Sequence, residues 1–425
     1  MHATLLPEQT LDHSLVDIVV IGEGEKAIQD LAKCLMSKGD LAGVKGIAFK
    51  DESGKFTRNE AQDYIDLDSL DYKLPYDQLD YDPAKLRKIP VHTSRGCPWR
   101  CAFCYNVTVH NRSYRVKSSE KVLDEIEYVV NTFNVNSIDF TMEDEFFINK
   151  SRVREILEGV VERKLNIKWT AFIRFDTLAR LDDDYMELLV RSGCSELSFG
   201  AESGSQRLLD EVVLKDVKVE TIIKGIQRLR DYKIPHLVSF ICGFPTETKK
   251  DIQETFNFIR KLSYQNKYFI NNCIFLFCPI PGTSLYDKVR KDFGWEPFRS
   301  LEEWGDFQMP LTNSTIMTWL DEDYRIFCEK VSFYSSLRGY EFSCPERFKN
   351  KSFLQQVAVK IMSRIQEFRV KKMNFDHLIE FKVYHFIFGG NTIYGKIPSL
   401  YWRIRRVIGR VIFSIFPRLK AMRSH

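Results

Sequence analysis

The sequence predicts an α/β protein built on a parallel sheet. Short β-rich runs alternate with segments of helical periodicity between residues 88 and 289. Small or acidic residues follow the ends of several of these β-rich runs, where parallel βα folds place their functional loops. Six such βα units can be counted, which is too few for a closed eight-fold barrel.

The expected elements follow in chain order. Val122, Ile126, Val129 and Phe133 recur at helical spacing and predict the first amphipathic helix. The predicted strands span residues 88–94, 137–142, 168–173, 195–200, 236–242 and 272–277. The predicted helices span residues 119–132, 151–163, 183–192, 219–232 and 249–262.

Three cysteines lie within eight residues in the loop after the first predicted strand. They form the segment Cys97-Pro98-Trp99-Arg100-Cys101-Ala102-Phe103-Cys104. A four-iron four-sulfur cluster normally takes four Cys thiolates, so three leave one iron open to another ligand. A zinc site and a buried apolar cluster are the alternatives. Zinc requires a further ligand, and neither His92 nor His110 forms a second paired-ligand element.

This cysteine spacing resembles that of the radical S-adenosylmethionine (SAM) superfamily. The resemblance includes the aromatic Phe103 before the last cysteine and the preceding segment Thr93-Ser94-Arg95-Gly96. It implies that Cys97, Cys101 and Cys104 hold a 4Fe-4S cluster whose open iron is chelated by SAM. One electron from the cluster then cleaves SAM to methionine and a 5′-deoxyadenosyl radical. The six βα units match the partial (β/α)6 TIM-like barrel of that family.

The resemblance also assigns SAM-binding roles to loops after later strands. Glu143 and Asp144 lie where the family holds the SAM amino group, and a carboxylate suits an ammonium. Glu202 and Ser203 fall in the loop assigned to the ribose and the methionine moiety. Gly243 begins a Gly/Pro segment beside SAM, and residues 279–283 resemble a loop against the adenine or the substrate. Taken singly, these segments also fit a solvated acidic loop, a helix cap or ordinary turns.

The first residues narrow the subfamily. Residues 2–25 resemble the closing stretch of a Rossmann-like cobalamin-binding domain, which implies the cobalamin-binding radical SAM class and cobalamin as a third cofactor. Residues 1–30 are then a remnant of that domain, 31–87 a linker, 88–290 the radical SAM core and 291–425 a helical C-terminal region. We expect an N-terminal truncation, because the β-like run 18–21 would lack sheet partners; loss of the domain is the alternative.

Composition and charge limit the partners and the compartment. A net charge of +4 implies no global polyanion partner, so nucleic acid is not expected. No signal peptide and no apolar run near ~18 residues is present, which predicts a cytoplasmic protein. The remaining cysteines are predicted to be free thiols. An apolar stripe with interspersed arginines over residues 400–415 predicts either peripheral membrane contact or packing on the core.

The leading functional hypothesis is a cobalamin-dependent radical SAM methyltransferase that acts on an unactivated carbon. A lipid, isoprenoid or tetrapyrrole is the suggested substrate, and flavodoxin or ferredoxin is the suggested reductant. A cobalamin-free radical SAM oxidase or cyclase is the second hypothesis. A methylthiotransferase is disfavoured, because the accessory domains usual for that class are not recognisable in this sequence. An iron-sulfur electron carrier or regulatory protein is the hypothesis from another class, and it predicts four protein ligands rather than three.

Overall fold

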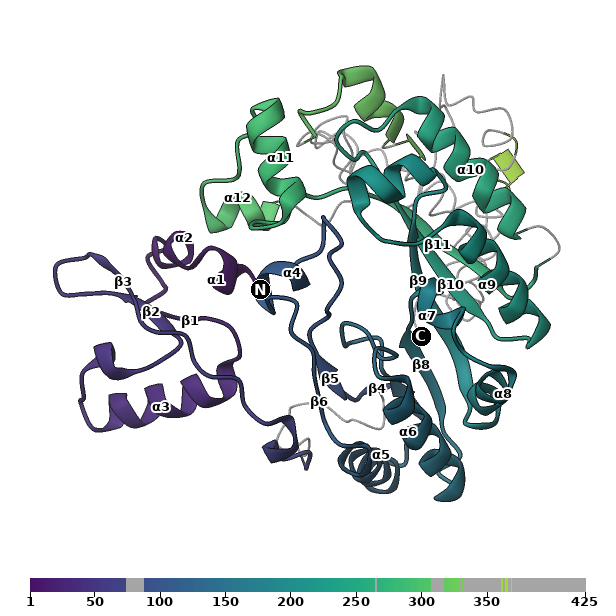
Figure 1. Cartoon of the computed structure of the whole chain (residues 1–425). Coiled ribbons are helices and arrows are strands. Elements are labelled where there is room, and N and C mark those ends of the chain that lie inside the picture. The colour runs from purple at the N-terminus through teal and green to yellow at the C-terminus, as the bar shows by residue number, and fades with distance from the viewer. Residues whose placement is uncertain are drawn as a thin grey trace, which may run out of the picture.

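A computed structural model describes residues 1–73, 88–263, 266–306 and 317–328 of the chain, together with a few single positions further on. Its central feature is a curved sheet of six parallel strands (Figure 1). In sheet order from one edge to the other, these are β11 (Phe269–Leu276), β10 (His236–Cys242), β9 (Cys194–Glu202), β8 (Lys168–Phe172), β7 (Ser137–Asp139) and β4 (Ile89–Pro90).

Helices cross over between these strands and cover the outer face of the sheet (Figure 1). They are α5 (Ser119–Phe133), α6 (Lys150–Glu162), α8 (Asp183–Arg191), α9 (Val219–Asp231) and α10 (Lys249–Ser263), whereas α11 (Ser284–Phe293) follows the last strand, β11. Val122 and Ile126 of α5 are fully buried, as are Trp169 of β8 and Phe199 of β9. Burial of such side chains stabilises the packing of helices on the sheet, because transfer of each one out of water contributes about 1.5–3 kcal/mol.

The predicted fold class is confirmed. All six predicted strands occur, in consecutive neighbouring order and with parallel pairing throughout. The sheet is an open half-barrel, as six βα units require. The strand predicted over residues 88–94 is shorter than expected, because the chain leaves the sheet after Pro90 and forms a hairpin from β5 (Ser94–Arg95) and β6 (Arg115–Val116).

Shorter elements connect the half-barrel. The short helix α4 (Asn106–Val109) follows the cysteine segment. Another short helix, α7 (Phe175–Leu178), follows β8, the third barrel strand in chain order. A π-helical turn, η5 (Leu208–Val213), follows β9, and α12 (Leu301–Asp306) follows α11. Residues 322–328 are helical.

The N-terminal residues form a small separate layer beside the half-barrel (Figure 1). An antiparallel sheet of β1 (Ile18–Val20), β2 (Ile47–Lys50) and β3 (Phe56–Arg58) carries α1 (His2–Leu5) and α2 (Pro7–Leu11) on one face and α3 (Gly24–Met36) on the other. Two short 3-10 turns, η1 (Leu41–Gly43) and η2 (Leu67–Ser69), follow α3 and β3.

This layer corrects one expectation. The β-like run at residues 18–21 is expected from the sequence to lack sheet partners, yet Ile18, Val19 and Val20 of β1 pair with β2, which falls in the predicted linker. The predicted boundary at residue 30 falls within α3, and the division into domains stays a prediction. The pairing arises because β1 and β2 bury their side chains against α2 and α3 together.

The described cysteine side chains are free thiols. Within the part of the chain that the structure describes, no helix has the length and apolar character needed to cross a membrane. The predicted basic amphipathic segment at residues 400–415 lies outside the described residues.

Candidate functional site

The three cysteines lie in the loop between β5 and α4, at the carboxyl end of the first barrel strand. Cys101 is buried, whereas Cys97 and Cys104 are partly exposed. The loop is tied to both sides of the barrel mouth through Ala102. Its N–H donates to the carbonyl of Val213 at 2.9 Å, and its carbonyl accepts from the N–H of Leu285 at 3.2 Å. These two hydrogen bonds fix the backbone of the cysteine loop between η5 and α11.

Gly96 sets the entry into this loop. Its φ of +83° lies in the left-handed region that favours glycine. A Cβ at this position would lie 2.1 Å from the carbonyl oxygen of Ser113 on the facing arm of the hairpin. Only glycine permits this close backbone approach, which places the hairpin directly beside Cys97.

Two of the three thiols, Cys97 and Cys104, are held in surroundings that disfavour free thiolate. Burial raises the pKa of Cys97 to about 12 and also raises the pKa of Cys104. Two donors nevertheless point at sulfur atoms: Arg174 Nη1 lies 3.6 Å from Cys101 Sγ, and Asn106 Nδ2 lies 3.8 Å from Cys104 Sγ. Such donors favour metal-bound thiolate, so the residues present fit an iron-sulfur cluster.

The cysteines do not converge on one point. Among the described residues, no three His, Cys, Asp or Glu side chains gather closely enough to hold a single metal ion. In a four-iron cluster each cysteine binds a different iron, so convergence is not required.

The acidic segment after β7 supports the cysteine loop directly. Glu143 is buried and accepts hydrogen bonds from Thr93 N–H at 3.1 Å and Ser94 Oγ at 2.7 Å. Asp144 accepts from the N–H of Gly96 at 2.8 Å. Burial raises the pKa of Glu143 to about 7, although these hydrogen bonds oppose the shift.

Asp144 also reaches the far end of the loop. It accepts hydrogen bonds from Tyr105 Oη at 2.5 Å and from Asn106 Nδ2 at 2.9 Å. The two carboxylates predicted to hold the SAM amino group therefore already bind protein donors on both sides of the cysteines.

The third acidic residue of the segment differs. Glu145 is 5% exposed, and its Oε1 is buried with no hydrogen-bond partner among the described residues. Burial raises the pKa of Glu145 to about 8, while Arg174 and Lys215 lower it by smaller amounts. A buried carboxylate oxygen without a donor is costly, so this one is suited to a ligand that brings a donor.

Glu202, at the end of β9, belongs to a buried ion pair. Its Oε1 lies 2.6 Å from Lys215 Nζ, and both side chains are less than a tenth exposed. Gly200 makes room for the pair, since a Cβ there would lie 2.1 Å from Glu202 Oε1. The pair is joined to the cysteine side of the site because Arg174 Nη2 donates to the carbonyl of Lys215 at 2.5 Å.

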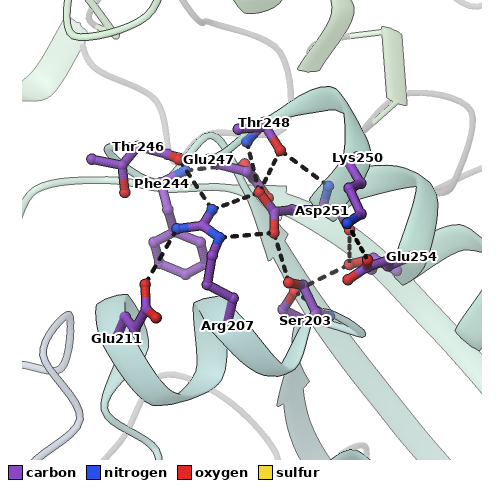
Figure 2. Close-up of polar contacts among 12 residues, drawn as sticks. Ser203, Arg207, Glu211, Phe244, Thr246, Glu247, Thr248, Lys250, Asp251 and Glu254 are labelled. Carbon is purple, nitrogen blue, oxygen red and sulfur yellow. Dashed lines mark hydrogen bonds and ion pairs between the residues drawn. The ribbon is translucent and has the colours of Figure 1, made fainter.

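The loops after β9 and β10 are held together by one carboxylate at the start of α10 (Figure 2). Asp251 accepts from Ser205 Oγ, Arg207 Nη2 and Thr248 Oγ1, each at 2.6 Å. Burial alone would raise the pKa of Asp251, but these donors outweigh it and lower the pKa to about 2. The network fixes the β9 loop against α10.

Two residues predicted to bind SAM, Ser203 and Gly243, form hydrogen bonds with other protein groups in this region. Ser203 is fully buried, and its hydroxyl lies 3.1 Å from Thr255 Oγ1 of α10. Gly243 donates its N–H to Glu247 and accepts from Trp319 Nε1 at 2.8 Å. A Cβ on Gly243 would lie 1.8 Å from Met317 Cε, so the later segment covers this glycine.

The remaining predicted positions lie at the barrel mouth. The Phe103 ring centroid is 6.3 Å from that of Phe244, which links the cysteine loop to the loop after β10. The loop after β11 meets α4, which follows the cysteine segment, since Thr108 Oγ1 donates to the carbonyl of Gly282 at 2.8 Å. No role could be assigned to Glu145, Arg174 or Lys215 from the sequence alone. A cation directly after a buried strand was the available signal for Arg174.

A cleft of about 550 Å³ opens between the N-terminal layer and this site. Met142, Glu143, Asp144 and Tyr105 line it on the barrel side. The opposite wall carries residues of the N-terminal layer, among them Thr4, Gly22, Glu23, Gly24, Glu25 and Ile28.

A parallel half-barrel with a three-cysteine loop at the carboxyl ends of its strands defines a class of iron-sulfur enzymes. Residues 91–259 match the family model described as the radical SAM superfamily, and this part of the chain belongs to that superfamily. A 4Fe-4S cluster and SAM are the cofactors that membership implies.

Curated relatives agree with this assignment. The chain is 32% identical over 291 residues to an uncharacterized methyltransferase of Pyrococcus horikoshii, covering 67% of this chain and 61% of the relative. It is 28% identical over 354 residues to an anaerobic magnesium-protoporphyrin IX monomethyl ester cyclase of Cereibacter sphaeroides, covering 80% of this chain and 56% of the relative. The chain thus spans less than two thirds of the length of these relatives.

Solved structures share the fold. The radical SAM methyltransferase TsrM of Kitasatospora setae superposes with a TM-score of 0.57 at 18% identity, over 69% of this chain and 57% of that chain. The cobalamin-dependent radical SAM enzyme OxsB superposes with a TM-score of 0.59 at 19% identity, over 99% of this chain and 62% of that chain.

Proposed function

We propose that this protein cleaves SAM reductively at a 4Fe-4S cluster held by Cys97, Cys101 and Cys104. The observation that carries the proposal is the framing of these three thiols by Glu143 and Asp144 at the carboxyl ends of a parallel half-barrel. Three protein thiolates leave one iron for the substrate. When bound, the cluster supplies the electron that splits SAM into methionine and a 5′-deoxyadenosyl radical.

The protein side chains bind and orient SAM. Glu143 and Asp144 remain our candidates for the region of the amino group, but their hydrogen bonds to the hairpin and to the cysteine loop give them a framing role as well. Glu145 offers the unpartnered carboxylate oxygen. An ammonium would satisfy that oxygen by a charge-assisted hydrogen bond, so we propose Glu145 as its direct acceptor.

The other predicted cofactor residues act from the opposite side. Glu202, fixed by Lys215, is proposed to accept hydrogen bonds from the ribose hydroxyls. Phe103 provides an aromatic wall beside Phe244. Ser203 and Gly243 are proposed to shape the pocket through their backbone, since the Ser203 hydroxyl and the Gly243 peptide groups contact other parts of the protein.

Carbon methylation is the proposed reaction. Relatives named as methyltransferases support it, including a bacteriochlorophyllide d methyltransferase of Chlorobaculum tepidum and a hopanoid C-3 methylase of Methylococcus capsulatus. The names of these relatives suggest a tetrapyrrole or an isoprenoid lipid as the substrate class. Cyclisation is the second candidate, because the cyclase of Cereibacter sphaeroides aligns with a larger share of the chain.

Cobalamin is proposed as an additional cofactor from the relatives, one of which is described with aqua-cobalamin bound. The cleft of about 550 Å³ is the size of a small-ligand pocket. We propose that the wall of this cleft that includes Gly22 and Gly24 faces the corrin.

The first experiment measures 5′-deoxyadenosine by mass spectrometry after anaerobic reconstitution with iron and sulfide and addition of SAM and dithionite. The full chain should form this product, and a Cys101→Ala variant should not. Lack of product from a full chain that carries its cluster would contradict the proposal.

A second measurement separates methylation from cyclisation. Transfer of a methyl group from SAM leaves S-adenosylhomocysteine, whereas cyclisation does not require it. With added cobalamin and a panel of tetrapyrrole and isoprenoid substrates, methylation predicts both S-adenosylhomocysteine and a product heavier by one CH₂. A product without S-adenosylhomocysteine would favour the cyclase alternative.

A further inference from the structure

Arg174 is a buried cation that touches the proposed cluster loop. It is the N-cap residue of α7, two positions after the end of β8, the third barrel strand, and 7% of its surface is exposed. Its Nη1 lies 3.6 Å from Cys101 Sγ, and its guanidinium carbon lies 4.2 Å from the centre of the Trp99 ring. Trp99 lies between the first two cysteines, so one side chain contacts both the loop and a ligand thiol.

The guanidinium is held rigidly in this position. Nη2 donates to the carbonyl of Lys215 at 2.5 Å, and Nε donates to Asp176 Oδ1 at 2.9 Å. These contacts use the fork geometry of arginine, which lysine cannot reproduce. The direction of Nη1 toward the sulfur is therefore set by the protein.

Two carboxylates act on the charge of Arg174, namely Asp176 and the buried Glu145. Asp176 is shared, because its other oxygen accepts from Arg180 Nη2 at 3.1 Å. Lys215, the next cation, is paired with Glu202 instead. The described donor to Cys104 is the neutral amide of Asn106, at 3.8 Å. Arg174 is thus the charged donor that the described residues place against a cysteine sulfur.

We propose that Arg174 is a positioning residue that raises the reduction potential of the cluster by donating a charge-assisted hydrogen bond to the Cys101 thiolate. This inference rests on the proposed function. Uptake of one electron from a low-potential donor such as a flavodoxin or ferredoxin takes [4Fe-4S]2+ to [4Fe-4S]+ and adds one negative charge without breaking a bond. A buried cation stabilises the more negative state, and hydrogen bonds to cluster sulfurs tune the potential.

The test is a redox titration of the anaerobically reconstituted full chain, followed by electron paramagnetic resonance of the reduced cluster. Arg174→Gln should shift the midpoint potential to a more negative value. Arg174→Lys keeps the charge but loses the fork, so its potential should fall between the two. Arg180→Gln is the matched control, because it removes an exposed arginine bound to the same aspartate, and it should leave the potential nearly unchanged.

Iron and sulfide contents are measured first and separate the two ideas. A wild-type chain that holds no cluster would overturn the proposed function. If wild type and Arg174→Gln hold equal clusters and titrate at the same potential, the inference about Arg174 is wrong. If Arg174→Gln does not load iron, Arg174→Lys decides: a wild-type potential in that variant overturns the inference, since a purely structural role would change loading but not potential.

Discussion

Gly96 shows how a single residue controls the entry to the cysteine loop. Its positive φ and the nearby carbonyl of Ser113 both exclude a side chain. Gly54, in the turn between β2 and β3, has a nearly identical φ of +81° but open space around its Cβ position. Substitutions at these two glycines therefore distinguish the effect of backbone strain from the effect of steric collision.

We predict that Gly96→Ala lowers iron loading severely, because the hairpin must move away from Cys97 to relieve the collision. Gly54→Ala should cost only the strain of the left-handed conformation, about 1–2 kcal/mol, and should keep its iron. Iron content after reconstitution and thermal unfolding measure the two effects. Equal iron loading in the two variants would argue against the proposed role of Gly96.

At the scale of elements, Asp251 joins the β9 loop to the start of α10 (Figure 2). Replacement by Asn removes the charge that three donors share, so we predict a loss of about 2–3 kcal/mol in unfolding free energy. Asp210→Asn is a suitable control, because Asp210 pairs with the exposed Lys218. Chemical denaturation of both variants tests this difference.

The same aspartate predicts a direction of pH dependence. Its pKa is about 2 in the folded protein, below the ordinary value of 3.8. The unfolded chain therefore binds the proton more readily, and the stabilisation is present above pH 4 and lost as the pH falls toward 2. Asp251→Asn should show a shallower loss of stability over this range than the wild type. Parallel acid curves for the two proteins would contradict the assignment.

At the scale of the whole molecule, two arginines of the β5–β6 hairpin attach the N-terminal layer to the half-barrel. Arg95 Nη1 lies 2.9 Å from Glu23 Oε2, and Arg95 Nη2 also contacts Glu25. Arg115 contacts Glu23 and donates to the carbonyl of Ile65 at 3.2 Å. The hairpin that leads into the cysteines is therefore also the docking point for the N-terminal layer.

A double-mutant cycle measures this attachment. Glu23 and Arg115 are less than a fifth exposed, so we predict a coupling energy of about 1–2 kcal/mol between Glu23→Ala and Arg115→Ala. The exposed helical pair Lys26–Asp30 should couple by only about 0.3–0.5 kcal/mol. A coupling at Glu23–Arg115 no larger than in this control pair would mean that the ion pair does not hold the layers together.

The order of the elements follows from local patterning, and the sequence alone predicted it. Strand and helix periodicity placed β10 at residues 236–242 and α5 within one residue of its end, because side-chain burial repeats at a fixed spacing in each element. The three-cysteine motif was equally predictable from the sequence, because the three residues lie within one short segment. The pairing of β1 with β2 could not be predicted from the sequence, because the two antiparallel strands lie about thirty residues apart and no turn signal joins them.

The tertiary structure alone decided which polar side chains meet. Arg174 and Cys101 are separated by 73 positions in the chain, and Gly243 and Trp319 by 76. Spacing in sequence carries no record of such contacts, since they depend on the curvature of the sheet and the path of each loop. The sequence thus determined the half-barrel and the cysteine motif, whereas the folded chain determined which carboxylate oxygen lacks a donor among the described residues and which cation reaches a thiol.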